Sequence, residues 1–404
     1  MIEQKHYRMH ILGLVHLPVS ERYMACAYTQ KIVKLSKMLL SLGHEVFLYG
    51  SEGSDAPCTE FIQTHTLKDI RNEWGEGDNR FEIGYDWRRK NFKHDFNKPP
   101  CEARIVSFKN CIKEINKRKK PDDFLLLSMG TYQKGVADAV KLILTCEPGI
   151  GYRGSYARYR AFESSYLQNF TYGFQQGNKS INGNWYDRVI PNYFDAKDFE
   201  FREKKDDYFL FIGRLIPRKG LRIAHQVTKE IGAKLKVAGQ GMKSWDGHKL
   251  VTDEMTIEGD NIDYIGCVGA EERKKLYAGA KATFVASLYL EPFGGVAVES
   301  QLSGTPVIST NFGVFPETVR QGITGYRCET LDDFIQAAKQ IDKIDPKVVR
   351  KWAEQYLMKN VRWLYQKWFE DLHDLYESIV DEKVKAWSRI YPESRENRRI
   401  VTNV

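Results

Sequence analysis

The sequence predicts an α/β protein with two doubly wound parallel-sheet domains and a helical C-terminal extension. Its 404 residues are too many for one ordinary core. Short apolar segments alternate with helical patterns in two successive runs, which is typical of parallel sheets covered on both faces. A polar, charged stretch near 192–205 separates the runs. We therefore expect Rossmann-like domains at 1–195 and 196–360, facing one another across a cleft, and an extension over 361–404 that crosses back onto the first domain.

The first run begins with an apolar segment at 10–15, which is typical of a buried parallel strand. A helical pattern over 22–42 follows, Gly43 ends it, and residues 45–49 predict the second strand. The remaining strands of this run are predicted at 124–128, 141–146 and 188–191, with helical stretches between them.

The second run begins with a strand-like segment at 208–212, followed by a helical pattern over 220–231. Further strands are predicted at 234–238, 262–265, 283–287 and 306–309, and further helices at 270–278 and 295–303. Beyond this run, an apolar stripe recurs every three or four residues at Leu364, Trp368, Leu372, Leu375 and Ile379. We interpret the stripe as the core-packing face of a long helix, rather than a membrane or partner helix.

Cysteine and histidine usage argues against a metal centre. The seven cysteines include no CxxC pair, and the nine histidines show no ligand spacing. We expect reduced thiols packed as small hydrophobes, and no structural metal. Apolar runs stay shorter than the ~18 residues that a transmembrane helix needs, and the N-terminal residues lack the layout of a secretory signal. We therefore expect a cytoplasmic protein.

The net charge is +8, and basic residues gather in two short runs at 87–90 and 113–120. Such a run is either a solvated helix face or a surface for an anionic partner, such as a phosphate-bearing substrate, a lipid headgroup or nucleic acid. We expect no nucleic-acid partner and keep a peripheral membrane contact as an alternative. The polar, aromatic stretch 71–100 has little periodicity and suits a lid or a binding loop.

The stretch 287–306 places two carboxylates and a glycine pair where a strand gives way to a helix. Glu291 lies in the loop, Gly294 and Gly295 let the backbone approach a ligand, and Glu299 follows about one turn into the helix. The unpaired N–H groups at the helix start form an anion site. The carboxylates suit ribose hydroxyls, which need acceptors. The alternatives are a solvated loop glutamate and an ordinary surface helix glutamate.

Two further loops follow strands of the same predicted sheet. The segment 213–220 carries Arg214 and Lys219, which supply the positive charge that a pyrophosphate leaving group requires. The turn 238–241 contains two glycines. Because ligands gather beyond the carboxyl ends of parallel strands, we expect the three loops to form one site.

These pieces together resemble the family-4 retaining glycosyltransferases of the GT-B fold. The matching segments are GRLIPRKG at 213–220, AGQG at 238–241, EPFGGVAVE at 291–299, SGTPVIST at 303–310 with the turn to Pro316 and Glu317, VIPNYFD at 189–195 and GHEVFLYG at 43–50. The most specific signal is the pair of glutamates with seven residues between them, together with the arginine–lysine loop. The resemblance covers the second domain well and the first more thinly.

The resemblance implies roles for the matching residues. Arg214 and Lys219 bind the diphosphate of a UDP-sugar or GDP-sugar, and Glu291 contacts hydroxyls of the transferred sugar; these three are the catalytic candidates. Glu299 binds the ribose. The other implied donor contacts are Phe293, Gly294, Gly295, Val296, Gly213, Gly239, Cys267 and Val268. The family retains the anomeric configuration, and needs neither a divalent metal nor a cofactor.

The first domain departs from the common pattern of the family. A Gly-Gly turn often follows the first strand, but this chain has His16 there, a candidate acceptor or phosphate contact or else a capped loop histidine. The segment 146–165 lies where many members carry a catalytic-looking histidine. Its candidate donor or acceptor contacts are Glu147, Tyr152 and Arg153, which we expect to face the strand end. The residues do not assign a catalytic base.

The expected activity is that of a hexosyltransferase-type glycosyltransferase (EC 2.4), which moves a sugar to a hydroxyl of a glycan or glycoconjugate. One alternative is a nucleotide-sugar epimerase on the same fold, which product analysis without an acceptor would separate from a transferase. The other is a non-enzymatic basic binding module. It explains the basic runs but leaves Glu291 and Glu299 without a purpose.

Overall fold

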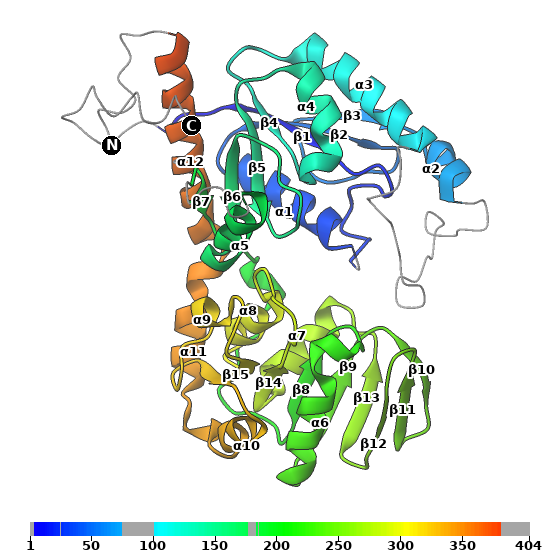
Figure 1. The fold of residues 1–404 in the computed structure, drawn as a ribbon, viewed down its shortest axis with the longest axis vertical. Helices are drawn as coiled ribbons and strands as arrows, with labels where there is room; N and C mark the ends of the chain where they lie inside the picture. The colour runs from blue at the N-terminus through cyan, green and yellow to red at the C-terminus, as the bar shows by residue number, and fades with distance from the viewer. Residues whose placement is uncertain (1–3, 25, 75–100, 177–182, 185, 381–404) are drawn as a thin grey trace, which may run out of the picture. The chain divides into compact units, whose positions relative to one another are not determined.

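The computed structural model describes residues 4–24, 26–74, 101–176, 183–184 and 186–380 (Figure 1). The chain divides into two compact units. Unit 1 comprises 1–162, 168–190 and 362–404, and unit 2 comprises 163–167 and 191–361. Most of the stretch 71–100, including the basic run 87–90, lies outside the described residues.

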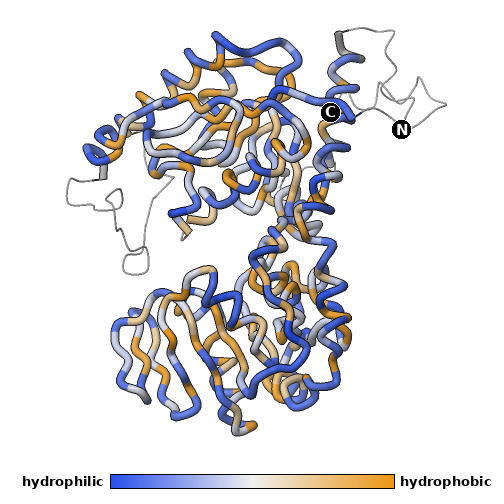
Figure 2. Tube along the Cα trace, turned by 180° about the vertical axis from the view of Figure 1, so that it is seen from behind, coloured by the Kyte–Doolittle hydropathy of each residue, from blue (hydrophilic) through white to orange (hydrophobic). Residues whose placement is uncertain are grey.

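Unit 1 is built on a parallel sheet with the strand order β3-β2-β1-β4-β5-β6-β7. The strands are β1 Arg8–Leu12, β2 Glu45–Ser51, β3 Glu60–His65, β4 Phe124–Leu126, β5 Thr145–Ile150, β6 Tyr159–Phe162 and β7 Arg188–Val189. The central strands are almost wholly buried, as a parallel sheet with helices on both faces requires. Figure 2 shows hydrophobic residues along these strands.

The helices of unit 1 that precede β7 are α1 Ala27–Ser41, α2 Leu67–Trp74, α3 Glu102–Arg118, the short η2 Gly130–Gln133, α4 Lys134–Val140 and α5 Ser165–Gln176. The first three residues of α5 count with unit 2. Ile115 of α3 and Val136 of α4 are fully buried in one cluster with Leu125 of the sheet. The prediction of a doubly wound first domain is confirmed.

Unit 2 contains a second parallel sheet, with the order β13-β9-β8-β14-β15-β16. Its strands are β8 Phe209–Ile212, β9 Leu235–Ala238, β13 Ile262–Gly266, β14 Ala282–Val285, β15 Val307–Thr310 and β16 Gly325–Cys328. The α-helices of this unit are α6 Leu221–Glu230, α7 Ala270–Gly279, α8 Gly295–Leu302, α9 Phe315–Thr318, α10 Leu331–Lys339 and α11 Pro346–Ala353. Its short 3-10 helices are η3 Ala196–Asp198, η4 Pro217–Lys219, η5 Ile341–Lys343 and η6 Glu354–Tyr356. The prediction of a second doubly wound domain is confirmed as well.

Several elements of the fold differ from the sequence-based expectations. The strands β3, β6 and β16 and the antiparallel sheet of β10 Met242–Trp245, β11 Lys249–Thr252 and β12 Thr256–Glu258 are not predicted. They are short, and polar residues interrupt their apolar pattern, so periodicity alone does not reveal them. The strand predicted at 141–146 begins later, at Thr145, because Lys141 adopts the left-handed conformation that ends α4.

The C-terminal stripe lies on α12, Met358–Val380, whose residues from Arg362 onward count with unit 1. Trp368, Leu372 and Leu375 are buried, and the Trp368 Nε1 atom donates a hydrogen bond to the Tyr186 carbonyl at 3.0 Å. Core packing is thus confirmed for these positions. Leu364 is the exception, because its side chain is 49% exposed. The Ile379 side chain lies outside the described residues.

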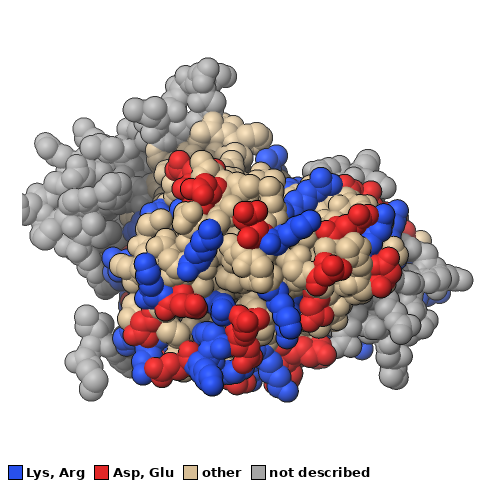
Figure 3. Space-filling view, turned by 90° about the horizontal axis from the view of Figure 1, so that it is seen from below, with Lys and Arg blue, Asp and Glu red and all other residues tan. Residues whose placement is uncertain are grey.

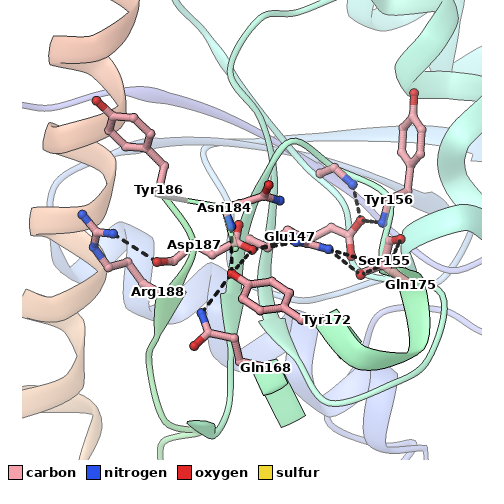
Figure 4. A network of polar contacts seen from close by, with 12 residues as sticks. Glu147, Ser155, Tyr156, Gln168, Tyr172, Gln175, Asn184, Tyr186, Asp187 and Arg188 are labelled. Carbon is pink, nitrogen blue, oxygen red and sulfur yellow. Dashed lines mark hydrogen bonds and ion pairs between the residues drawn. The ribbon is translucent and has the colours of Figure 1, made fainter. Parts of the chain in front are cut away.

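A buried ion pair holds β6 to β7 in unit 1. Asp187 accepts hydrogen bonds from Arg160 Nε at 3.0 Å and from Tyr172 Oη at 2.8 Å. The Arg160 guanidinium also donates to Ser155 Oγ at 3.2 Å and to Gln175 Oε1 at 2.7 Å. Figure 4 labels the partners Ser155, Tyr172, Gln175 and Asp187, which come from the loop between β5 and β6, from α5 and from the position just before β7. The network therefore ties three elements of unit 1 to one carboxylate.

Basic and acidic side chains alternate on the surface of the described residues. In the basic run 113–120, Lys117 and Arg118 bind Glu114, and Arg118 also binds Glu60. These pairings favour the solvated helix face over a surface for an anionic partner. Cationic and anionic side chains are likewise interspersed on the face shown in Figure 3. In the described part of the chain, no helix is long and apolar enough to cross a membrane.

Candidate functional site

Three loops of unit 2 come together at the carboxyl edge of its sheet, after β8, β9 and β14. A Cβ atom on Gly239 would stand 1.7 Å from the Gly213 carbonyl oxygen, and one on Gly220 would stand 1.9 Å from that of Ala286. The Leu288 N–H donates to the Arg218 carbonyl at 2.7 Å. The three loops therefore contact one another, as the sequence predicts. Their close backbone contacts are possible only because these positions are glycine.

A methyl group at Gly239 is expected to disturb both loops that it separates. We predict that Gly239→Ala lowers the free energy of unfolding by more than about 2 kcal/mol, because the Cβ overlaps a backbone atom that cannot move aside. Urea unfolding of the purified variant measures this. Gly247→Ala is the matched control, since Gly247 also has a positive φ but faces open space. Equal losses in the two variants would contradict the prediction.

Lys219 and Glu291 form the centre of the site. The Lys219 Nζ atom lies 2.7 Å from Glu291 Oε1 and 2.8 Å from Tyr289 Oη. Glu291 also accepts from Ser287 Oγ at 2.8 Å on Oε1 and from Tyr289 Oη at 2.6 Å on Oε2. Lys219 ends the short η4 turn, and the left-handed Gly220 turns the chain into α6. A cation and an acceptor carboxylate thus lie side by side above the sheet.

Two arginines add positive charge beside this pair. Arg214 and Arg218 are exposed, and the Arg218 guanidinium lies 5.2 Å from the centre of the Tyr289 ring. Burial and the neighbouring Glu291 raise the pKa of Tyr289, against the opposing effect of both arginines. The phenol therefore stays protonated and donates to Glu291. Lys219, Arg214 and Arg218 outnumber the Glu291 carboxylate beside them, so an anion is favoured next to this pair.

The glycine pair opens α8 as expected. Gly294 is the N-cap and adopts a left-handed conformation with φ +69°, and Gly295 begins the helix. The Phe293 side chain is buried among Phe194 and Tyr356, so only its backbone is available to a ligand. Val296, which follows in the first turn, packs its side chain on the core. The helix start therefore offers N–H groups rather than side chains.

Glu299 lies one turn further along α8 and faces α7. Its Oε2 atom accepts from Tyr277 Oη at 3.0 Å and lies 3.9 Å from Arg273 Nε. The charge of Glu299 raises the pKa of Arg273, although burial opposes this. The Glu299 side chain is 18% exposed. Tyr277 and Arg273 therefore orient a partly accessible carboxylate, as a hydroxyl acceptor needs.

Cys267 and Val268 follow β13, next to the Gly239 turn. The Gly239 N–H donates to the Gly266 carbonyl at 2.9 Å, and Cys267 and Val268 are both partly exposed. The structure places them at the same edge of the sheet, on the far side of the Gly239 turn from Gly213.

The sequence of the second unit is similar to known glycosyltransferases. Residues 194–345 match the family model of the glycosyl transferases group 1. The second unit is a group 1 glycosyltransferase domain. An uncharacterized glycosyltransferase of Methanocaldococcus jannaschii is 30% identical over 151 residues, which cover 36% of this chain and 36% of that protein. The D-inositol 3-phosphate glycosyltransferase of Mycobacterium avium is 34% identical over 125 residues, which cover 30% and 29%. The chain thus spans about a third of the length of these relatives.

Solved structures extend the similarity of fold over both units. AviGT4, a glycosyltransferase involved in avilamycin A biosynthesis, matches with a TM-score of 0.59 and 17% identity, over 91% of this chain and 98% of its own. Sucrose-phosphate synthase from Thermosynechococcus elongatus matches with a TM-score of 0.58 and 16% identity, over 93% and 99%. Anabaena HepE in complex with UDP and glucose matches with a TM-score of 0.57 and 12% identity, over 90% and 99%. The fold is GT-B.

The candidates in unit 1 divide into two groups. Glu147 and Tyr152 are brought together, because Glu147 accepts from Tyr152 Oη at 3.1 Å and from the Ala157 N–H at 2.6 Å. Glu147 lies within β5 and is fully buried, which raises its pKa, so the expectation that it faces the strand end is wrong. Its bonds hold the following loop against the sheet (Figure 4).

His16 and Arg153 lie apart from that pair. The His16 ring is buried, and its Nε2 atom lies 3.8 Å from Cys26 Sγ. This fits the alternative of a packed loop histidine better than a ligand contact. Arg153 is exposed, and its guanidinium lies 5.7 Å from the centre of the Phe170 ring.

Sequence reasoning overlooked the residues that hold the two glutamates of the glycosyltransferase domain. Tyr289 and Ser287 bind Glu291, while Tyr277 and Arg273 bind Glu299. Ser287 and Tyr289 lie within four residues of Glu291, so that spacing was a usable signal. Tyr277 and Arg273 lie on another helix, and no sequence signal indicates them.

Proposed function

We propose that this protein transfers a hexose from a nucleoside diphosphate sugar to a hydroxyl group of a glycan or glycoconjugate. The observation that carries this proposal is the clustering of three cations, a helix start and two oriented carboxylates at one edge of the unit 2 sheet. A diphosphate needs the first two, and the hydroxyls of ribose and sugar need the carboxylates.

In this proposal each part of the site meets one part of the donor. Lys219, Arg214 and the start of α8 face the diphosphate, Glu299 meets the ribose hydroxyls, and Glu291 meets the transferred sugar. The nucleobase rests beside Cys267 and Val268. The HepE complex with UDP and glucose makes UDP the first nucleotide to test, with GDP as the second.

The proposed reaction retains the anomeric configuration. The acceptor oxygen approaches the anomeric carbon from the face that the diphosphate leaves. The bond from carbon to the phosphate oxygen breaks as the glycosidic bond forms, and the acceptor proton passes to that phosphate oxygen. Lys219, Arg214 and the helix start stabilise the departing charge, which makes a divalent metal unnecessary in this scheme. A sugar trapped covalently on any side chain would contradict it.

Binding of the donor is tested by thermal unfolding with UDP, GDP, ADP and their sugars in the presence of a chelator. A ligand at 100 times its dissociation constant should add about 2.7 kcal/mol of stability. We expect Glu299→Ala to weaken the favoured nucleotide by about ten- to a hundredfold, because two ribose hydroxyls lose a charged acceptor.

Glu230→Ala, which removes an exposed glutamate at the end of α6, is the control and should bind as the wild type does. If no nucleotide stabilises the wild type, the proposed function fails. If a nucleotide does stabilise the wild type, product analysis without an acceptor separates a transferase from an epimerase, which would convert the nucleotide sugar without releasing a nucleoside diphosphate.

A further inference from the structure

Tyr289 closes a three-membered polar cluster at the heart of the proposed donor site. Its hydroxyl lies 2.8 Å from Lys219 Nζ and 2.6 Å from Glu291 Oε2, and Lys219 Nζ lies 2.7 Å from Glu291 Oε1. Each member therefore contacts both others. The Glu291 side chain is only 10% exposed, so little water reaches the cluster.

Glu291 has one hydrogen-bond acceptor position left for a ligand. Oε1 accepts from both Lys219 and Ser287, which occupies its two lone-pair directions. Oε2 accepts from Tyr289 and has one direction left. Glu291 in this state can therefore accept from one sugar hydroxyl, on the oxygen that Tyr289 holds.

A diphosphate and Glu291 compete for the same cation. Lys219 has a flexible stem and a compact charge, so it can turn from a carboxylate to a phosphate. When it turns, Glu291 loses its charged partner and keeps only Ser287 on Oε1 and Tyr289 on Oε2. Without Tyr289, only Ser287 would hold the carboxylate, and Oε2 would no longer be fixed in the sugar subsite.

We propose that Tyr289 is a positioning residue for the sugar of the donor: its hydroxyl holds Glu291 in the sugar subsite while Lys219 exchanges the carboxylate for the diphosphate. This inference rests on the proposed function and deepens it. The consequence is that Tyr289 governs the affinity gained from the sugar, rather than the affinity for the nucleoside diphosphate.

The structure offers a variant that removes only the hydroxyl. The Tyr289 ring lies 4.8 Å from Lys219 Nζ and 5.2 Å from the Arg218 guanidinium, so Tyr289→Phe keeps the aromatic surface beneath both cations. Tyr208→Phe is the matched control, because it removes a buried hydroxyl that donates to the Leu276 carbonyl at 2.8 Å, away from the cluster.

Isothermal titration with UDP and UDP-glucose, or with GDP and GDP-mannose if guanine is preferred, tests the proposal. The quantity to compare is the ratio of the dissociation constants of nucleoside diphosphate and nucleotide sugar. Tyr289→Phe is expected to reduce this ratio by about tenfold, without weakening the nucleoside diphosphate itself, because one hydrogen bond to a charged group is lost. Tyr208→Phe should keep the wild-type ratio.

Glu291→Gln supplies an independent measurement of the competition. Its neutral amide no longer holds Lys219 by charge, so the nucleoside diphosphate without sugar should bind several-fold more tightly than to the wild type. A nucleoside diphosphate that binds Glu291→Gln more weakly would overturn the exchange of Lys219.

The outcomes separate this inference from the proposed function. If the wild type binds none of UDP, GDP and ADP, the proposed function fails and the inference fails with it. If the wild type binds one, but Tyr289→Phe keeps the full sugar-dependent ratio or the wild type gains no affinity from the sugar, the inference alone is wrong.

Discussion

Lys219→Ala is expected to lower kcat/KM for sugar transfer by about 10²–10³-fold, which corresponds to the loss of one preorganised charge facing the leaving group. The ammonium lies next to Glu291 and beside the loop that leads into α8, where the proposed diphosphate rests. The loss has two sources: a weaker hold on the diphosphate before reaction and less stabilisation of the charge that grows as the bond breaks. Arg214 and Arg218 remain and should preserve residual activity.

The rate is measured as the release of nucleoside diphosphate from the favoured nucleotide sugar, with an acceptor that supports turnover in the wild type. Lys229→Ala, which removes an exposed lysine on α6, is the control for net charge and should leave the rate unchanged. A Lys219→Ala variant with more than about a tenth of wild-type activity would exclude a catalytic role for this ammonium, since that loss matches no more than an ordinary hydrogen bond.

Arg160→Met is expected to reduce the free energy of unfolding by about 3–5 kcal/mol, because it leaves the buried Asp187 carboxylate without its cation. Burial raises the pKa of Asp187, and the hydrogen bonds from Arg160 and Tyr172 oppose that effect. Removing Arg160 leaves the cost of burial largely uncompensated. Ser155 Oγ and Gln175 Oε1 lose a donor in the same substitution (Figure 4).

Urea unfolding followed by circular dichroism provides the measurement. The control is Lys134→Ala, which breaks an exposed ion pair with Asp138 in the same unit and should shift the midpoint little. The double variant Arg160→Met with Asp187→Leu should recover part of the lost stability, because an apolar pair needs no charge compensation. Similar midpoints for Arg160→Met and Lys134→Ala would show that the buried pair does not stabilise unit 1.

The sequence was sufficient for those parts of the fold that repeat a strong pattern. Strands such as β2 and β8 and helices such as α6 and α7 lie within a few residues of their predicted places, because long apolar or amphipathic runs reflect burial directly. The antiparallel sheet of β10, β11 and β12 was beyond reach. Its strands are short, and β10 is mostly exposed, so no apolar run marks it.

In the candidate site, too, some features are predictable from the sequence and others are not. The glycines and the glutamate pair stand in recognisable spacing, and the structure brings their loops together. Tyr289 and Lys219 are 70 residues apart, and their contact depends on the path of two loops. Glu147 was misplaced because its segment resembles a loop, whereas the backbone continues β5 through Ile150 and buries the carboxylate. Hydrogen-bond partners, unlike spacing, become visible only in three dimensions.

The chain passes between the two units at 162/163, 167/168, 190/191 and 361/362, and this has a consequence for how the protein is made. Trp368, Phe369 and Leu372, which fill the core of unit 1, are synthesised after all of unit 2. The segments of unit 1 that precede unit 2 therefore emerge from the ribosome before α12 has been synthesised. Until then, the apolar surface that α12 covers in the folded protein is exposed to water. Unit 2 can close earlier, since it ends at Val361. We expect the nascent first half to depend on protection by chaperones until α12 has been synthesised.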